Sequence, residues 1–196
     1  MKRLSALVIC PGRGTYNRQE LGYLAKNHHQ QQSMLSGFDK CRIALGQPSL
    51  TQLDSATTYS TNRLTRGDNA SSLIYACAYA DFLSINHDKF DIVGVAGNSM
   101  GWYIALACAG VLEANHGFKV VNTMGTLMQE ALIGGQLLYP YVDENWIEIP
   151  RKRNELMALT DRISGLYLSI NLGGMIVFAG TEKALKTCEQ GLEPIQ

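Results

Sequence analysis

Two short apolar runs, each followed directly by a glycine-rich turn, are the clearest pattern in the chain. Leu4 to Ile9 is apolar apart from Ser5, is too short for a helix and leads into Pro11-Gly12-Arg13-Gly14. Asp91 to Ala96 is a similar run, and Gly97 to Gly101 follows it. Runs of this length and composition are typical of parallel strands that are buried on both faces. We therefore expect two buried parallel strands that both end in tight turns.

Helical patterns occupy the sequence between and after these strands. Polar-rich patterns run from Asn17 to about Leu45, and a break at Gly46-Gln47-Pro48 opens a Ser/Thr-rich connection that extends to Thr65. Asp68 or Asn69 is the expected cap of the next helix, because its side-chain oxygen can accept a hydrogen bond from a free amide. The expected helices are Ala70 to Phe82, Trp102 to Ala109 with Gly110 as its stop, and about Phe118 to Leu132.

The pattern changes after Gly134-Gly135 to short alternating strands with intervening helices. Strands are expected at Gln136 to Val142, Leu166 to Asn171 and Met175 to Ala179, and helices at Arg151 to Ile163 and Glu182 to Gln190. This β-α-β-β-α order lacks one strand of a ferredoxin-like unit. The expected fold is an α/β large subdomain over residues 1–132 and an incomplete ferredoxin-like small subdomain over residues 133–196.

Composition excludes several classes of function. The 196 residues carry 17 Lys and Arg and 17 Asp and Glu, so no net charge attracts nucleic acid or anionic lipid. The longest uncharged apolar stretch, Trp102 to Leu112, is too short to cross a bilayer. The five cysteines form no Cys-x-x-Cys pair, which favours a reducing, cytoplasmic location. We expect no partner among nucleic acids or membranes.

The histidines do not point to a metal centre. His28 and His29 lie in a polar run, while His87 and His116 are expected in loops, and none has the spacing of a metal ligand pair. We expect no bound metal and no bound cofactor.

The chemical signal of the chain is Gly97-x-Ser99-x-Gly101, placed between a predicted strand and a predicted helix. A serine on such a sharp turn needs small neighbours, because a side chain at either glycine would collide with the strand or the helix. This is the arrangement of a nucleophile elbow in a hydrolase-like parallel sheet. Ser99 is therefore the candidate nucleophile.

Several segments together resemble one enzyme family. They are Ile9 to Gly14, Val95 to Tyr103, Ala105 to Leu112 and Met128 to Ala131. In order and spacing they resemble malonyl-CoA:acyl-carrier-protein transacylases and the acyltransferases of polyketide synthases, over essentially the whole chain. The resemblance implies that Ser99 accepts an acyl group from an acyl-CoA and passes it to the phosphopantetheine thiol of an acyl carrier protein. It also implies that the backbone amides of Met100 and Arg13 form the oxyanion hole.

The acyl pocket departs from the family pattern. Arg13 replaces the usual glutamine of the first loop, and Asn98 and Trp102 replace the usual histidine and glutamate around the serine. The family arginine that binds the malonyl carboxylate aligns with Met124, which cannot pair with an anion. We expect Met124, Asn98 and Arg66 to contact the acyl group. Met124 favours a neutral acyl chain, whereas Arg13 or Arg66 could instead supply a cation for malonyl.

The family's catalytic histidine lies beyond the position that corresponds to Gln196. On the resemblance, these residues correspond to the first two-thirds of a longer enzyme, and the chain alone is expected to transfer slowly. A serine esterase or thioesterase remains an alternative, because an elbow serine serves both chemistries. An acyl-binding protein that has lost turnover is the non-enzymatic alternative.

Overall fold

The structure is a computed structural model that describes residues 2–131 and 134–193. It divides into two compact units, residues 1–131 and 132–196, where the sequence led us to expect a boundary after residue 132. No helix within the described ranges is both long and apolar enough to cross a bilayer.

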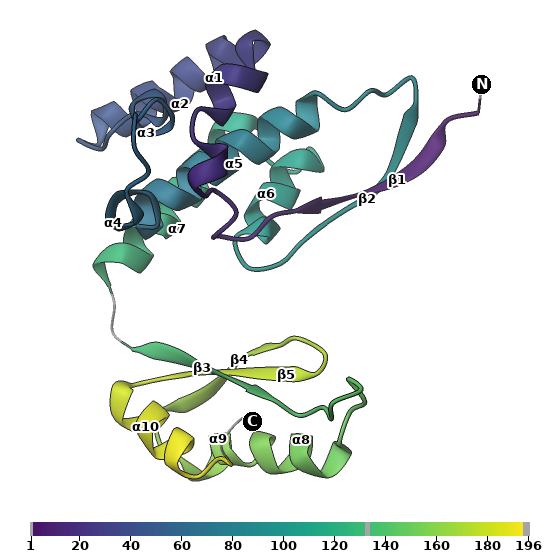
Figure 1. The fold of residues 1–196 in the computed structure, drawn as a ribbon, viewed down its shortest axis with the longest axis vertical. Helices are drawn as coiled ribbons and strands as arrows, with labels where there is room; N and C mark the ends of the chain where they lie inside the picture. Colours follow the sequence, from purple (N-terminus) through teal and green to yellow (C-terminus); the bar gives the residue numbers. More distant parts are fainter. Residues whose placement is uncertain (1, 132–133, 194–196) are drawn as a thin grey trace. The chain divides into compact units, whose positions relative to one another are not determined.

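The first unit contains two parallel strands and a set of helices (Figure 1). Its pairing register joins Leu4 to Phe90 and Cys10 to Gly97, so both strands end at the same edge of the sheet. The elements are β1 (Leu4–Cys10), η1 (Arg18–Glu20), α1 (Tyr23–Asn27), η2 (His29–Gln31), α2 (Gln32–Ala44), α3 (Leu50–Asp54), α4 (Thr61–Leu64), α5 (Gly67–Leu83), β2 (Phe90–Gly97), α6 (Gly101–Cys108) and α7 (Ala114–Glu130).

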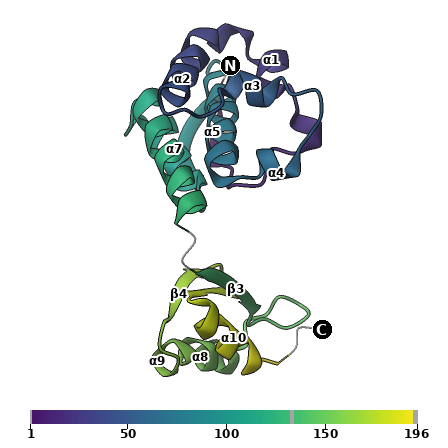
Figure 2. The ribbon, with the colours of Figure 1, turned by 90° about the vertical axis from the view of Figure 1, so that its left-hand side faces the viewer.

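The core of the first unit lies where α2, α5 and α7 pack together (Figure 2). Phe38 of α2 stacks on Phe118 of α7 with ring centroids 4.2 Å apart, and Tyr75 of α5 meets both rings edge-on. All three rings are buried. Aromatic side chains bury large areas, so this cluster ties three helices distant in sequence into one layer.

The face of the sheet that points away from these helices remains exposed. Val8 and Val95 point inward, while Leu7, Ile9 and Val93 are 60%, 74% and 65% exposed. The prediction that both faces of these strands are buried is therefore wrong for the described residues.

The second unit is a three-stranded antiparallel sheet with helices on one face (Figure 2). Its strand order is β3-β5-β4, and its core contains Tyr139, Leu166 and Phe178. The elements are β3 (Gly135–Pro140), α8 (Pro150–Met157), α9 (Leu159–Arg162), β4 (Leu166–Asn171), β5 (Met175–Gly180) and α10 (Glu182–Gln190). The β-α-β-β-α succession is the one expected, with α9 as an additional short helix.

Several boundaries differ from the prediction. The helix predicted from Ala70 begins at Gly67 with Arg66 as its cap, so the capping role predicted for Asp68 or Asn69 is wrong. The helix predicted from Phe118 begins at Ala114 and includes His116, which was expected in a loop; its predicted last residue, Leu132, lies outside the described residues. The predicted Ser/Thr-rich connection contains the short helices α3 and α4. The helix predicted over residues 151–163 is divided into α8 and α9, and the strand predicted to reach Val142 ends at Pro140.

Candidate functional site

Ser99 lies on the turn that joins β2 to α6. Its φ is +55°, which is an uncommon conformation for a residue with a side chain. Ser99 is exposed, whereas the following residue, Met100, is buried. Strained backbone of this kind persists only where the surrounding structure enforces it, and it concentrates at functional sites.

Backbone contacts exclude any residue with a side chain at the two glycine positions that flank this turn. A Cβ atom on Gly97 would lie 2.2 Å from the carbonyl oxygen of Gly101, and one on Gly101 would lie 2.4 Å from that of Cys10. Neither contact can be relieved by rotating a side chain, because the obstructing atoms are backbone. The strand, the turn and the helix N-terminus therefore fit together only with glycine at both positions.

The loop after β1 packs against the same turn. A Cβ atom on Gly12 would lie 3.6 Å from the carbonyl oxygen of Asn98 and 4.0 Å from the Cβ of Ser99. The parallel register brings these two segments together, because both strands end at one edge of the sheet. This edge is where open α/β sheets bind their ligands.

The backbone amides of the turn differ in whether they donate a hydrogen bond. Ser99 donates its amide to Asn98 Oδ1 (2.8 Å), Gly101 donates to the Asn98 carbonyl (2.9 Å) and Trp102 donates to the Ser99 carbonyl (3.2 Å). Among the described residues the Met100 amide has no such partner. An unoccupied amide directly after an exposed serine is available to an oxyanion.

The residues expected around the acyl group differ in their exposure and in whether they already have a hydrogen-bond partner. Arg66 forms a two-pronged pair with Asp68, with both N···O distances 3.1 Å, and its side chain is about half exposed. The hydrogen bond and the negative charge of Asp68 raise the pKa of Arg66. Met124 is 36% exposed on α7. Arg66 is therefore already engaged with a carboxylate, and Asn98 is engaged with the Ser99 amide.

Arg13 extends to the contact between α5 and α7. Its Nη1 atom lies 3.1 Å from the position that a Cβ on Gly67 would occupy, and the carbonyl oxygen of Gly125 lies 2.8 Å from the same point. No ion pair of Arg13 occurs in the described part of the chain. The structure thus brings the Arg13 side chain beside the residue that follows Met124.

The histidines do not provide a base for Ser99 within the described ranges. His28 is buried and bonds Asp81 (2.9 Å), and His116 lies 3.8 Å from Glu113. No hydrogen bond joins the Ser99 hydroxyl to a described histidine. Residues 2–131 and 134–193 also contain no group of three or more His, Cys, Asp or Glu side chains that could hold a metal ion.

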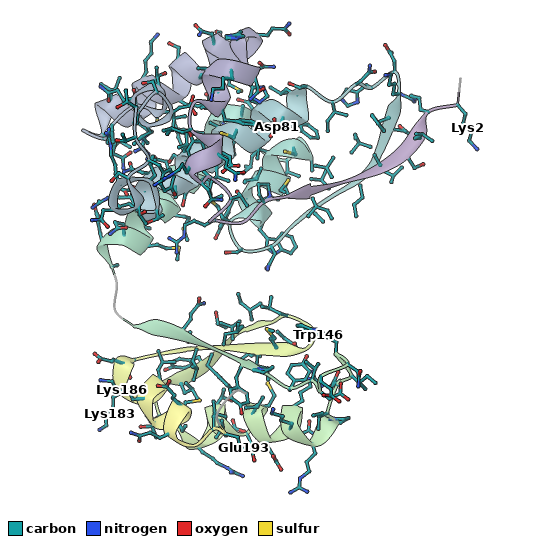
Figure 3. All side chains as sticks on the ribbon, viewed as in Figure 1. Lys2, Asp81, Trp146, Lys183, Lys186 and Glu193 are labelled. Atoms are coloured by element: carbon teal, nitrogen blue, oxygen red, sulfur yellow. The ribbon has the colours of Figure 1, made fainter. Side chains whose placement is uncertain are left out.

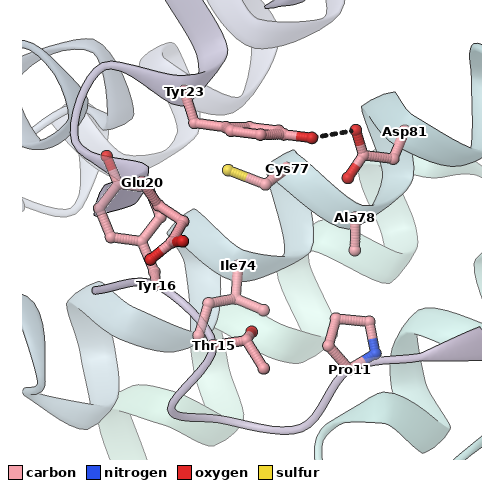
Figure 4. Close-up of a pocket in the computed structure, with 9 residues that line it drawn as sticks. All are labelled: Pro11, Thr15, Tyr16, Glu20, Tyr23, Ile74, Cys77, Ala78 and Asp81. Atoms are coloured by element: carbon pink, nitrogen blue, oxygen red, sulfur yellow. Dashed lines mark hydrogen bonds between the residues drawn. The ribbon is translucent and has the colours of Figure 1, made fainter. Parts of the chain in front are cut away.

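Sequence reasoning did not find a cavity of about 200 Å³ beside the loop that follows β1. Tyr16, Glu20, Tyr23, Cys77 and Asp81 are among the residues that line it (Figure 4). The available signal was the pair Cys77 and Asp81, which lie one helical turn apart on a helix that is otherwise largely apolar.

No family model matches the chain. Two curated relatives match about half of it. It is 33% identical over 95 residues to a malonyl CoA-acyl carrier protein transacylase of Haemophilus influenzae, covering 47% of this chain and 29% of the relative. It is 31% identical over 99 residues to the polyketide biosynthesis protein ThaF of Burkholderia thailandensis, covering 50% of this chain and 8% of the relative.

Solved structures match almost all of the chain. A malonyl-CoA:ACP transacylase of Synechocystis aligns with a TM-score of 0.71 at 20% identity, covering 98% of this chain and 60% of that one. A malonyl CoA-acyl carrier protein transacylase of Burkholderia pseudomallei aligns with a TM-score of 0.72 at 17% identity, covering 100% and 62%. The chain is thus similar to transacylases and polyketide-synthase acyltransferases, has their α/β fold, and spans less than two-thirds of their length.

Proposed function

We propose that this chain carries the nucleophile of an acyltransferase that moves an acyl group from coenzyme A to the thiol of an acyl carrier protein. The observation that carries the proposal is the turn at Ser99, where an exposed serine with φ +55° is followed by the unoccupied Met100 amide. The likeness to proteins named malonyl-CoA:ACP transacylase supports the reaction class. It does not favour the esterase alternative.

In the proposed first step, the Ser99 hydroxyl oxygen attacks the thioester carbonyl of the acyl-CoA. The new bond joins the serine oxygen to the acyl carbon, the bond from that carbon to sulfur breaks, and the hydroxyl proton leaves with the coenzyme A thiol. The second step is the reverse reaction with the carrier thiol, so the serine is free again at the end. The Met100 amide, with that of Arg13, stabilises the negative oxygen in each step.

Within the described part of the chain, no hydrogen bond joins the Ser99 hydroxyl to a histidine that could act as the base. General-base assistance is worth about 10²–10⁴-fold, so acylation of Ser99 by these residues alone is expected to be slow.

The cytoplasmic location expected from the cysteines also stays a prediction.

We infer that Met124 favours a neutral acyl group. A malonyl carboxylate that loses water on binding requires a cation, and Met124, which is 36% exposed, supplies none. One observation favours malonyl as a second candidate. Arg13 has no ion pair in the described part of the chain and reaches Gly67 beside Gly125. Its guanidinium is therefore available to a substrate carboxylate.

The proposal is tested by trapping the acyl-enzyme. After incubation with acyl-CoA and acid quenching, peptide mass spectrometry should locate the ester on Ser99. The Ser99→Ala variant should carry none, and Ser33→Ala, which changes an exposed serine on α2, should be acylated like the wild type. An unchanged adduct in Ser99→Ala would refute the assignment.

A further inference from the structure

The cavity beside the loop after β1 is separate from the turn at Ser99. It lies between that loop, the region of η1 and α1, and one face of α5 (Figure 4). Ile74, Cys77, Ala78 and Asp81 recur at helical spacing and form the α5 side. Its volume of about 200 Å³ suits a ligand smaller than a typical drug.

Each of two carboxylates in this cavity has one oxygen without a hydrogen bond in the described part of the chain. Asp81 Oδ1 accepts hydrogen bonds from the Tyr23 hydroxyl (2.8 Å) and from His28 Nε2 (2.9 Å), whereas Oδ2 accepts none. Glu20 Oε2 accepts from the Asn17 amide (2.6 Å), whereas Oε1 accepts none. Glu20 and Asp81 stand on opposite sides of the cavity (Figure 4), and Figure 3 marks the position of Asp81 on α5.

The other polar groups of the lining are uncharged at neutral pH. Burial, and next the hydrogen bond to Asp81, raise the pKa of Tyr23 to about 12. Burial, and next the charges of Asp54 and Asp81, raise the pKa of the Cys77 thiol. No lysine or arginine is among the described residues that line the cavity. Its charge is therefore negative, and it favours a cation.

The remaining walls favour an organic cation over a metal ion. Ile74, Ala78 and Pro11 are apolar, and the rings of Tyr16 and Tyr23 belong to the same lining. Calcium requires six to eight oxygen ligands and magnesium an octahedral set, whereas an alkylammonium combines apolar carbon with a charged end. Aromatic rings also attract ammonium groups.

We propose that this cavity binds a short aliphatic diamine. One ammonium group donates to Asp81 Oδ2 and the other to Glu20 Oε1, while the methylene chain lies along Ile74 and Ala78. Because Pro11 and Thr15 also line the cavity, the bound diamine touches the loop that packs on the turn at Ser99.

Calorimetric titration with 1,4-diaminobutane at neutral pH and constant ionic strength tests the proposal. Saturable binding at one site is expected for the wild type, and none for butane-1,4-diol, which has the same length without charge. Asp81→Asn and Glu20→Gln should each weaken binding about tenfold or more, since each removes a charged acceptor. Asp88→Asn, which changes an exposed carboxylate outside the cavity, is the matched control.

A second variant separates loss of the site from loss of folding. Ala78→Leu fills the space without altering any charge and is expected to abolish binding while circular dichroism stays as in the wild type. The proposal is overturned if the wild type does not bind the diamine, if the diol binds as tightly, or if the Asp81→Asn and Asp88→Asn variants bind alike.

Discussion

Gly101 of α6 and Cys10 of β1 approach so closely that a Cβ atom on Gly101 would stand 2.4 Å from the Cys10 carbonyl oxygen. This contact joins the end of the first strand to the first residue of the helix after Ser99. It holds the two loops of the candidate site at a fixed separation, because backbone meets backbone with no side chain between them.

The Gly101→Ala variant is expected to lose about 1–3 kcal/mol of unfolding free energy, because the added methyl overpacks this contact. Gly12→Ala is the matched control, since its Cβ would meet the nearest atom at 3.6 Å, an ordinary contact distance. Urea denaturation of both variants checks the prediction. Equal losses of unfolding free energy in the two variants would show that the contact with Cys10 does not exclude a side chain at position 101.

Arg42 is expected to be the most costly polar side chain to remove from the first unit. It is fully buried and donates to the carbonyls of Pro48 (2.6 Å) and Asp68 (2.7 Å) and to the amide oxygens of Asn69 (2.6 Å) and Asn122 (2.7 Å). Arg42→Met removes the side-chain donor of the Pro48 carbonyl and of Asn69 Oδ1, and leaves the Asp68 carbonyl and Asn122 Oδ1 with Ser72 as their side-chain donor, which should cost about 3–5 kcal/mol. Thermal and urea unfolding should show a much smaller effect for Lys40→Met, an exposed position on the same helix.

Acyl selectivity is expected to depend on residues 13 and 124. With neutral acyl groups preferred, the wild type should have a higher kcat/KM for acetyl-CoA than for malonyl-CoA. Met124→Arg should raise the malonyl value about tenfold or more by supplying a charged partner. The opposite result, a wild-type preference for malonyl that disappears in Arg13→Gln, would show that Arg13 binds the carboxylate instead.

Stability should decline at high pH partly through Tyr23. Burial and Asp81 raise its pKa from 10.0 to about 12, so the folded state holds this proton more tightly than the unfolded state. The stabilisation is present in full below pH 10 and is lost as the pH rises towards 12. The unfolding free energy of Tyr23→Phe, measured across this range, should fall less steeply than that of the wild type. Parallel curves would contradict the assigned shift.

The strands and long helices were predictable because their patterns are local. The apolar runs at Leu4 and Asp91 and the alanine-rich segments 70–82 and 102–109 specify their own structure. Helix α3 also has a local signal in the sequence. Ser49 and Gln52 form a reciprocal capping box at its start.

The start of α5 was not predictable, because it depends on contacts that are distant in sequence. Gly67 begins the helix where its backbone packs on Gly125 and its amide donates to Gln129 Oε1 (3.0 Å). Asp68, the expected cap, instead pairs with Arg66, and the side chain of Asn69 bonds Arg42. The neighbouring Arg66 thus engages Asp68, and the distant Arg42 engages Asn69, so neither side chain caps the helix.

The candidate site was partly predictable. The Gly97-x-Ser99-x-Gly101 spacing marks the turn in the sequence, and the structure places it between strand and helix. The direction of the Arg13 side chain and the cavity beside α5 depend on segments joined only by the fold. No local pattern specifies them.

The pairing of β1 with β2 also determines when the site forms during folding. The two strands are separated by η1, η2 and α1 to α5, so their register closes a long loop at an entropic cost that local helices do not have. Contacts of this kind form slowly compared with local ones. A nascent chain that has completed α5 therefore contains α1 to α5 but lacks α7, Ser99 and the strand that pairs with β1. The turn at Ser99 and the loop at Arg13 therefore come together only once β2 has paired with β1, and local opening of β1 would separate them again.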